Sequence, residues 1–127
     1  AALAAERRSE AAMQSIQAAH DRFVREVAEG KFLWQSDRAV HLAIAEASGN
    51  EFFPRCLEGP EVSLEDFMTV SLSLTSSRSA ERGQLVVREH TNIVDAIRAR
   101  DSVGARVAME FHIVQARRRM LDRSLAP

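Results

Sequence analysis

The chain has 127 residues, and its 17 Lys and Arg residues balance 18 Asp and Glu residues, leaving a formal net charge of −1. This length fits one domain and excludes a helical DNA-binding module joined to a separate sensor domain of ordinary size. The balanced charge argues against a stand-alone nucleic-acid binder, because phosphate contacts require a basic excess.

Cysteine usage and apolar patterning indicate the environment of the chain. Cys56 is the single cysteine, so neither an intrachain disulfide nor a CxxC metal site is available. No apolar run approaches the roughly 20 residues needed to cross a bilayer, and the N-terminal stretch lacks the apolar core of a signal peptide. We therefore expect a cytoplasmic protein with no membrane partner.

The first helical segment runs from about Leu3 to Glu29. Ser9 followed by Glu10 is suited to capping a second start inside this segment, and Gly30 is placed to end it. Its apolar stripe, which also carries His20, consists of Met13, Ile16, Phe23 and Val27.

The second helix is predicted from about Phe32 to Ser48. Gly49 ends it, and Asn50 can cap the next helix, where Pro54 falls in the first turn and its missing N–H costs little. The stretch from Gly59 to Gly83 carries both helical spacing and a short strand-like alternation. Helix is favoured there, because an isolated strand would have no sheet partner, with a polar loop at residues 75–80.

Two helices complete the predicted fold. One runs from about Gln84 to Arg98, with Val86, His90, Ile93 and Ile97 on one face. Asp101 is a good N-cap for the last helix, from Ser102 to about Arg123, whose C-terminal Arg117, Arg118 and Arg119 suit the helix dipole. The apolar stripe of this helix is Val103, Val107, Phe111, Val114 and Leu121. These elements predict an all-α protein, an antiparallel bundle of roughly five to seven helices.

Four polar side chains occur where apolar ones would be expected: Asp37, His41, His90 and His112. Asp37 and His41 lie four residues apart on one helical face, and the other two lie in or beside the stripes of the last two helices. Imidazole and carboxylate are common ligands of divalent transition metals. Taken singly, each is more often an ordinary surface or hydrogen-bonded core residue, but burying four unpaired would cost several kcal/mol. Packing and a metal site both stay open on these grounds, and His20 is assigned to packing.

Three segments resemble one known family. Asp37–His41 with Ala45–Asn50 is similar to a D-x-x-F-H … A-S-G-N signature, and Glu89–Asp101 is similar to E-H-x-x-I-x-x-A-I-x-x-x-D. Ala105–His112 is similar to A-R-x-A-M-x-x-H. In this order they resemble the C-terminal (FCD) domain of FadR-type regulators in the GntR family of bacterial transcription factors. The resemblance covers about Ala2 to Arg123.

The resemblance implies a single all-helical domain over residues 1–127 with a divalent metal, Zn, Ni or Mn, in its core. It implies that Asp37, His41, His90 and His112 are the ligands and that open metal positions take a small organic acid. It also implies a homodimer that reaches DNA only through a winged-helix domain outside this chain. Val40 replaces the family's Phe, and the family's R-x-x-L-E stretch would precede Ala1, so the domain is expected to be truncated at its N-terminus.

We therefore expect a metal-dependent carboxylate sensor of a transcription regulator and not an enzyme. Val86, Ile93 and Gln115 are the candidate effector-binding residues, as helical neighbours of His90 and His112. One alternative is a helical metalloenzyme, a hydrolase or transferase, that uses the same four residues. It lacks an obvious general base, because Glu89 points about 100° away from His90 on an ideal helix. Another alternative is a metal-free dimerisation module.

Overall fold

Six α-helices make up the part of the chain that the computed structural model describes, residues 1–31, 34–58 and 79–124, and no strand occurs there. The helices are α1 (Ala2–Arg7), α2 (Glu10–Ala28), α3 (Trp34–Ala47), α4 (Phe52–Glu58), α6 (Ser79–Arg98) and α7 (Ser102–Ser124). The all-helical prediction is confirmed. None of the described helices is both long and apolar enough to cross a membrane.

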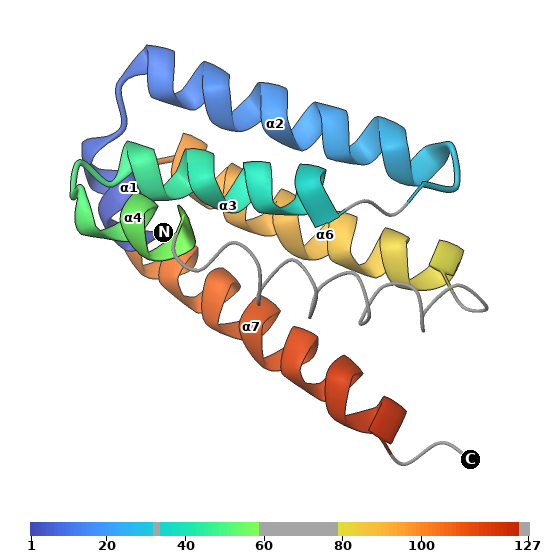
Figure 1. The fold of residues 1–127 in the computed structure, drawn as a ribbon. Coiled ribbons are helices and arrows are strands. Elements are labelled where there is room, and N and C mark those ends of the chain that lie inside the picture. Colours follow the sequence, from blue (N-terminus) through green and yellow to red (C-terminus); the bar gives the residue numbers. More distant parts are fainter. Residues whose placement is uncertain (32–33, 59–78, 125–127) are drawn as a thin grey trace.

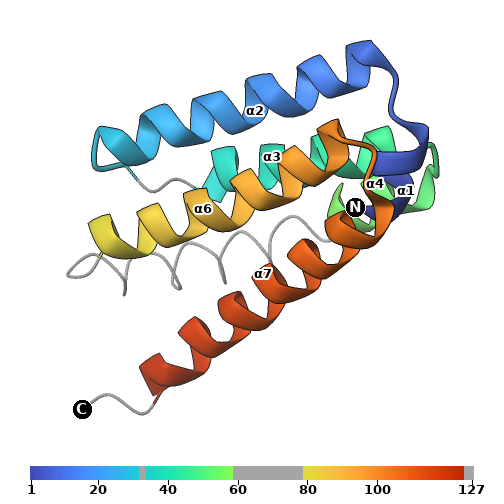
Figure 2. The same ribbon diagram turned by 180° about the vertical axis from the view of Figure 1, so that it is seen from behind.

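α2 connects the other long helices of the bundle. It packs against both α3 and α6, α6 packs against α7, and the short α1 and α4 lie together at one end (Figures 1 and 2). α2 runs antiparallel to α3 and to α6. α7 starts against the closed end and then diverges, so that its C-terminal half points away from α2.

Local signals in the sequence place the helix boundaries. The Ser9 hydroxyl accepts a hydrogen bond from the Ala12 backbone N–H and caps α2, which separates it from α1 as predicted. Gly30 follows the end of α2 with φ of 75°, a left-handed conformation that glycine adopts without strain. At the start of α7, the Asp101 carboxylate accepts a hydrogen bond from the Gly104 N–H.

One predicted boundary was wrong. α6 begins at Ser79 and not near Gln84, so the last residues of the predicted polar loop belong to the helix. Serine is favoured at helix starts, and the acidic Glu81 interacts well with the N-terminal end of the helix dipole. The helix predicted over the preceding stretch, residues 59–78, lies outside the described residues.

The core forms where α2, α3 and α6 meet. Fully buried apolar side chains come from all three helices: Ile16, Phe23, Val40, Ile93, Val94 and Ile97. Ile16, Phe23, Ile93 and Ile97 lie on the stripes predicted from the sequence, and burial of this core removes one face of each helix from water. The site described below lies beside this core.

The apolar stripe predicted for the last helix does not face the core. Val103, Val107, Phe111, Val114 and Leu121 are 46–66% exposed, whereas Ala105 and His112 are buried. Helical spacing identifies a stripe but not what it faces. The small side chains on the opposite face let α7 approach α1 and α6 closely.

Arg8 ties the junction of α1 and α2 to the C-terminal end of α6. Its guanidinium is 8% exposed and donates hydrogen bonds to the backbone carbonyls of Ile97 at 3.2 Å and Arg98 at 2.7 Å. It also pairs with Glu10 at 2.7 Å. A cation at a helix C-terminus satisfies carbonyls that have no partner within the helix.

Replacing Arg8 is expected to destabilise the bundle. Arg8→Ala removes charged donors from two helix-end carbonyls, which should lower the free energy of unfolding by about 2–3 kcal/mol. The measurement is urea denaturation followed by circular dichroism. Arg25→Ala, an exposed arginine in the last turn of α2, is the control and should change stability by about 0.5 kcal/mol or less. Equal effects of the two substitutions would contradict the role of Arg8.

His20 is a buried core histidine, as assigned from sequence. Its Nε2 lies 3.0 Å from the Thr91 hydroxyl, which itself donates to the Val87 carbonyl, and its Nδ1 is buried without a hydrogen-bond partner. Burial lowers the pKa of His20, because the imidazolium form would place a charge in the core.

The lowered pKa makes stability depend on pH. The unfolded chain protonates His20 near pH 6.5 while the folded chain keeps it neutral, so stability is full above about 6.5 and falls as the pH drops. Each such proton costs up to about 1.4 kcal/mol per pH unit. Denaturation of the chelator-treated protein at pH 7.5 and 5.5 should show a smaller loss for His20→Gln than for the wild type. An unchanged loss would contradict this assignment.

Candidate metal centre

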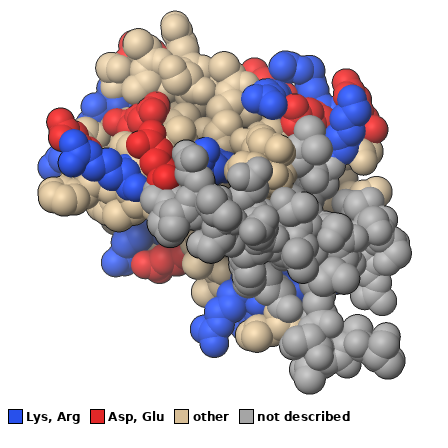
Figure 3. All heavy atoms as spheres, in the orientation of Figure 1, with Lys and Arg blue, Asp and Glu red and all other residues tan. Residues whose placement is uncertain are grey.

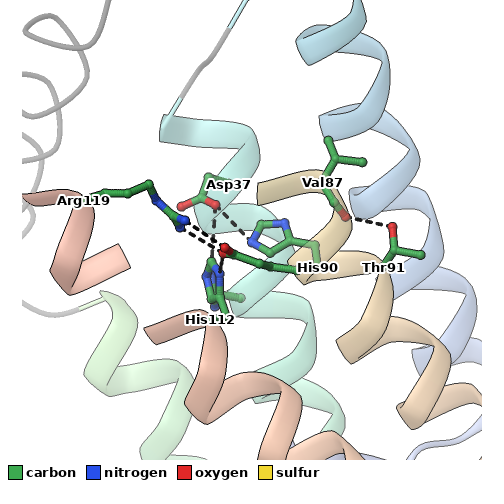
Figure 4. A network of polar contacts seen from close by, with 8 residues as sticks. Asp37, Val87, His90, Thr91, His112 and Arg119 are labelled. Carbon is green, nitrogen blue, oxygen red and sulfur yellow. Dashed lines mark hydrogen bonds and ion pairs between the residues drawn. The ribbon is translucent and has the colours of Figure 1, made fainter. Parts of the chain in front are cut away.

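Three helices bring the four polar residues of the sequence analysis to one point. α3 carries Asp37 and His41 one turn apart, α6 carries His90, and α7 carries His112. Their side chains converge between the helices, as the close-up in Figure 4 shows for the labelled Asp37, His90 and His112. The four are buried or nearly so, with side-chain exposures of 0–19%.

The separations of the polar atoms suit a metal ion. The candidate ligand atoms of His41, His90 and His112 all lie within 4.8 Å of one another. His41 Nε2 and His112 Nε2 are 3.2 Å apart, and Asp37 Oδ1 lies 3.3 Å from His90 Nε2 and 3.9 Å from His41 Nε2. Ligands about 2.0–2.1 Å from a tetrahedral ion are about 3.3–3.4 Å apart. Around such an ion the longer of these separations, up to 4.8 Å, would have to shorten.

His90 is the residue that packing explains least. It is fully buried, and neither of its ring nitrogens makes a hydrogen bond of acceptable geometry. Its ring packs against Phe23 and lies edge-on to His41 and His112. Asp37 Oδ1 is 3.3 Å from Nε2 but not in hydrogen-bond geometry. A buried imidazole without a well-formed hydrogen bond costs free energy, and coordination through Nε2 would remove part of that cost.

Glu89 orients one of the histidines. Its Oε2 lies 2.7 Å from His112 Nδ1, and both carboxylate oxygens accept hydrogen bonds from Arg119 at 2.7 and 2.9 Å (Figure 4). In the tautomer of His112 that donates its Nδ1–H to this carboxylate, the Nε2 lone pair is directed at the cluster. A carboxylate behind a histidine is a common support for metal ligands.

The pKa shifts of Asp37 and His41 keep both in the form that binds a metal at neutral pH, and that of Glu89 keeps its carboxylate ionised. Burial alone would raise the pKa of Glu89, but hydrogen bonds from Arg119 and His112 outweigh it and lower the pKa to about 2. Burial also opposes ionisation of Asp37, yet contact with His90 and the neighbouring histidines lowers its pKa. Burial is the main cause that lowers the pKa of His41 to about 4, so its imidazole is neutral.

Sequence reasoning missed Glu89 and Arg119. Glu89 was rejected as a general base because it points away from His90 on its own helix, but its hydrogen-bond partner, His112, is on α7. Arg119 was assigned to the helix dipole, whereas it pairs with a buried carboxylate. The only available signal was the Glu-His pair within the family motif.

The predicted effector residues occupy two kinds of environment. Val86 and Ile93 are 5% and 0% exposed and pack in the core, whereas Gln115 on α7 is half-buried. A cavity of about 230 Å³ borders His41. The cavity is lined mainly by apolar side chains of α3, α4 and α7: Ile44, Ala45, Phe53, Leu57 and Met109.

The arrangement offers ligands and no evident general base. Both oxygens of Glu89 are held by Arg119, and Glu46 and Glu110 are exposed. On the face drawn in Figure 3, the described Lys and Arg side chains are interleaved with Asp and Glu, so no extended basic surface for nucleic acid appears there.

Comparison with known proteins agrees with this geometry. A model of the FCD domain family matches residues 1–115. The chain is 31% identical over 113 residues to the HTH-type transcriptional regulator LutR of Bacillus subtilis (strain 168), a match that covers 89% of this chain and 52% of LutR. The chain thus spans about half the length of this relative. It belongs to the FCD domain family, which provides the effector-binding domains of GntR-family transcription regulators.

Proposed function

We propose that the chain senses a small carboxylate through a divalent metal bound by Asp37, His41, His90 and His112. The observation that carries this proposal is the buried convergence of three imidazoles with one carboxylate, in which His90 has no hydrogen-bond partner. The donor set fits Zn, Ni or Mn, because nitrogen and oxygen ligands suit all three ions.

The metal would supply a fixed positive charge that attracts and orients the carboxylate of the effector. Ions that accept more than four ligands keep open positions when four protein ligands are in place. The cavity beside His41 can take the organic part of a small acid, and its apolar lining favours a hydrocarbon group there. Gln115 is the half-buried candidate for a further polar contact.

Effector binding would be transmitted through a change in helix packing. Because the four ligands come from α3, α6 and α7, effector binding would favour one packing of these helices over another. We propose that the domain works as a homodimer and that DNA is bound by a winged-helix domain outside residues 1–127. The relative's name and its extra length support this division.

Metal content and carboxylate binding test the proposal together. Purified without a His-tag or chelator, the chain should hold about one equivalent of a transition metal by elemental analysis. A His90→Ala/His112→Ala variant should lose it, and His20→Gln, a buried histidine outside the cluster, should keep it. Acetate, pyruvate and lactate should be screened at increasing concentration, and at least one should raise the melting temperature of the metal-loaded chain only.

Three outcomes would contradict the proposal. Full metal content in the double variant would place the metal elsewhere. If added Zn, Ni and Mn leave the melting temperature unchanged, no metal binds the folded state, and the metal-free dimerisation module becomes the better description. Metal-dependent hydrolysis of simple esters would instead favour the metalloenzyme.

The Glu89–Arg119 pair should control metal affinity. In Arg119→Ala, Glu89 loses two of its three hydrogen bonds, so it holds His112 less firmly and metal affinity should fall about 10–100-fold. Titration calorimetry with the metal found by elemental analysis measures this change. Arg25→Ala, an exposed arginine in the last turn of α2, is the control. Equal affinities of the two variants would contradict the role of Arg119.

A further inference from the structure

The outer face of α7 is apolar and exposed. Val103, Val107, Phe111 and Val114 are 46–66% exposed, and Leu121 continues the same line. The inner face of α7 carries the buried Ala105 and His112, so the helix is already packed against its own bundle on the other side. Contiguous apolar surface of this kind on a soluble domain marks an interaction site.

The spacing of this face fits pairing with another helix. Val107, Phe111, Val114, Arg118 and Leu121 follow one another at intervals of four, three, four and three residues. That repeat of seven residues keeps one seam facing a partner helix along several turns. Arg118 is the single charged residue within the seam.

The charges beside the seam identify the partner as a second copy of the same helix. Glu110 and Arg117 lie seven residues apart on one flank, and both are exposed. Glu110 lies 4.0 Å from Arg106 Nε on the same helix, a long and exposed ion pair that contributes little. When two identical helices pair antiparallel, the same flank of each faces the other, so Glu110 lies opposite Arg117 of the second copy, twice over.

Parallel pairing is disfavoured by Arg118. It would place the two Arg118 side chains in one layer of the seam, with like charges facing each other. Antiparallel pairing instead sets Arg118 against Val107 of the second copy and Phe111 against Val114. The arginine stem then packs on the valine while its charge remains in water.

We propose that this chain dimerises through an antiparallel, two-fold pairing of α7 with α7 along Val107, Phe111 and Val114, with reciprocal Glu110–Arg117 ion pairs. The pairing gives a contact surface to the homodimer of the proposed function. It rests on the proposed function only in that the chain forms a homodimer. Because His112 lies on the opposite face of the same helix, a shift of α7 at the ligand cluster would also move the dimer seam.

Charge reversal tests the pairing. Sedimentation velocity over a concentration series should show a dimer for the wild-type 127-residue chain. Glu110→Arg and Arg117→Glu should each weaken dimerisation at least about tenfold, because each places like charges opposite each other at two symmetric positions. The double variant should return to within about threefold of the wild type, because the pairs reform with exchanged signs.

A matched pair of apolar substitutions locates the seam. Val114→Glu should yield a monomer, whereas Ile113→Glu, which alters a similarly exposed apolar residue beside the seam, should remain dimeric. Circular dichroism and metal content check that both variants fold. A dimer that survives Val114→Glu would overturn this surface but leave the homodimer standing. Failure of the double charge variant to recover would overturn the antiparallel pairing, and a monomeric wild type would overturn both, independently of the metal and carboxylate test.

Discussion

The buried imidazole of His90 imposes the constraint around which the centre of this bundle is organised. A histidine without hydrogen-bond partners inside a helical core costs free energy. Asp37 and His41 of α3 and His112 of α7 reach the same point, so the packing of three helices depends on how these polar side chains are satisfied. A positive ion at this point would satisfy all four side chains together.

Arg119 and Glu89 extend that constraint along α7. The carboxylate sits between His112 and a guanidinium seven residues further along the helix, so the orientation of a candidate ligand depends on a residue two turns away. The pKa of about 2 for Glu89 keeps this arrangement ionised through the physiological range. The divergent half of α7 is thereby tied to the ligand cluster, although it points away from the main core (Figure 1).

α7 is therefore a helix with two different faces. Its inner face carries the small Ala105 and the ligand-type His112, and its outer face carries exposed Val107, Phe111 and Val114. α7 is therefore the helix on which the candidate ligand His112 and the proposed dimer seam meet, on opposite faces.

The starts of α2 and α7, the stop after α2 and the buried stripe of α2 followed from the sequence, because caps and apolar spacing act locally, whereas the start of α6 did not. Ser9, Gly30 and Asp101 each act where the sequence places them, and Ile16, Phe23 and Val27 are buried as their spacing indicates. The ordered motifs around Asp37, His90 and His112 also identified the family, although whether these residues bind a metal remains a prediction. Tertiary structure decided which face of α7 turns inward, since a stripe carries no information about what covers it. It also decided that Glu89 serves His112 and not its neighbour His90, because that contact depends on how two helices pack rather than on the geometry of either one.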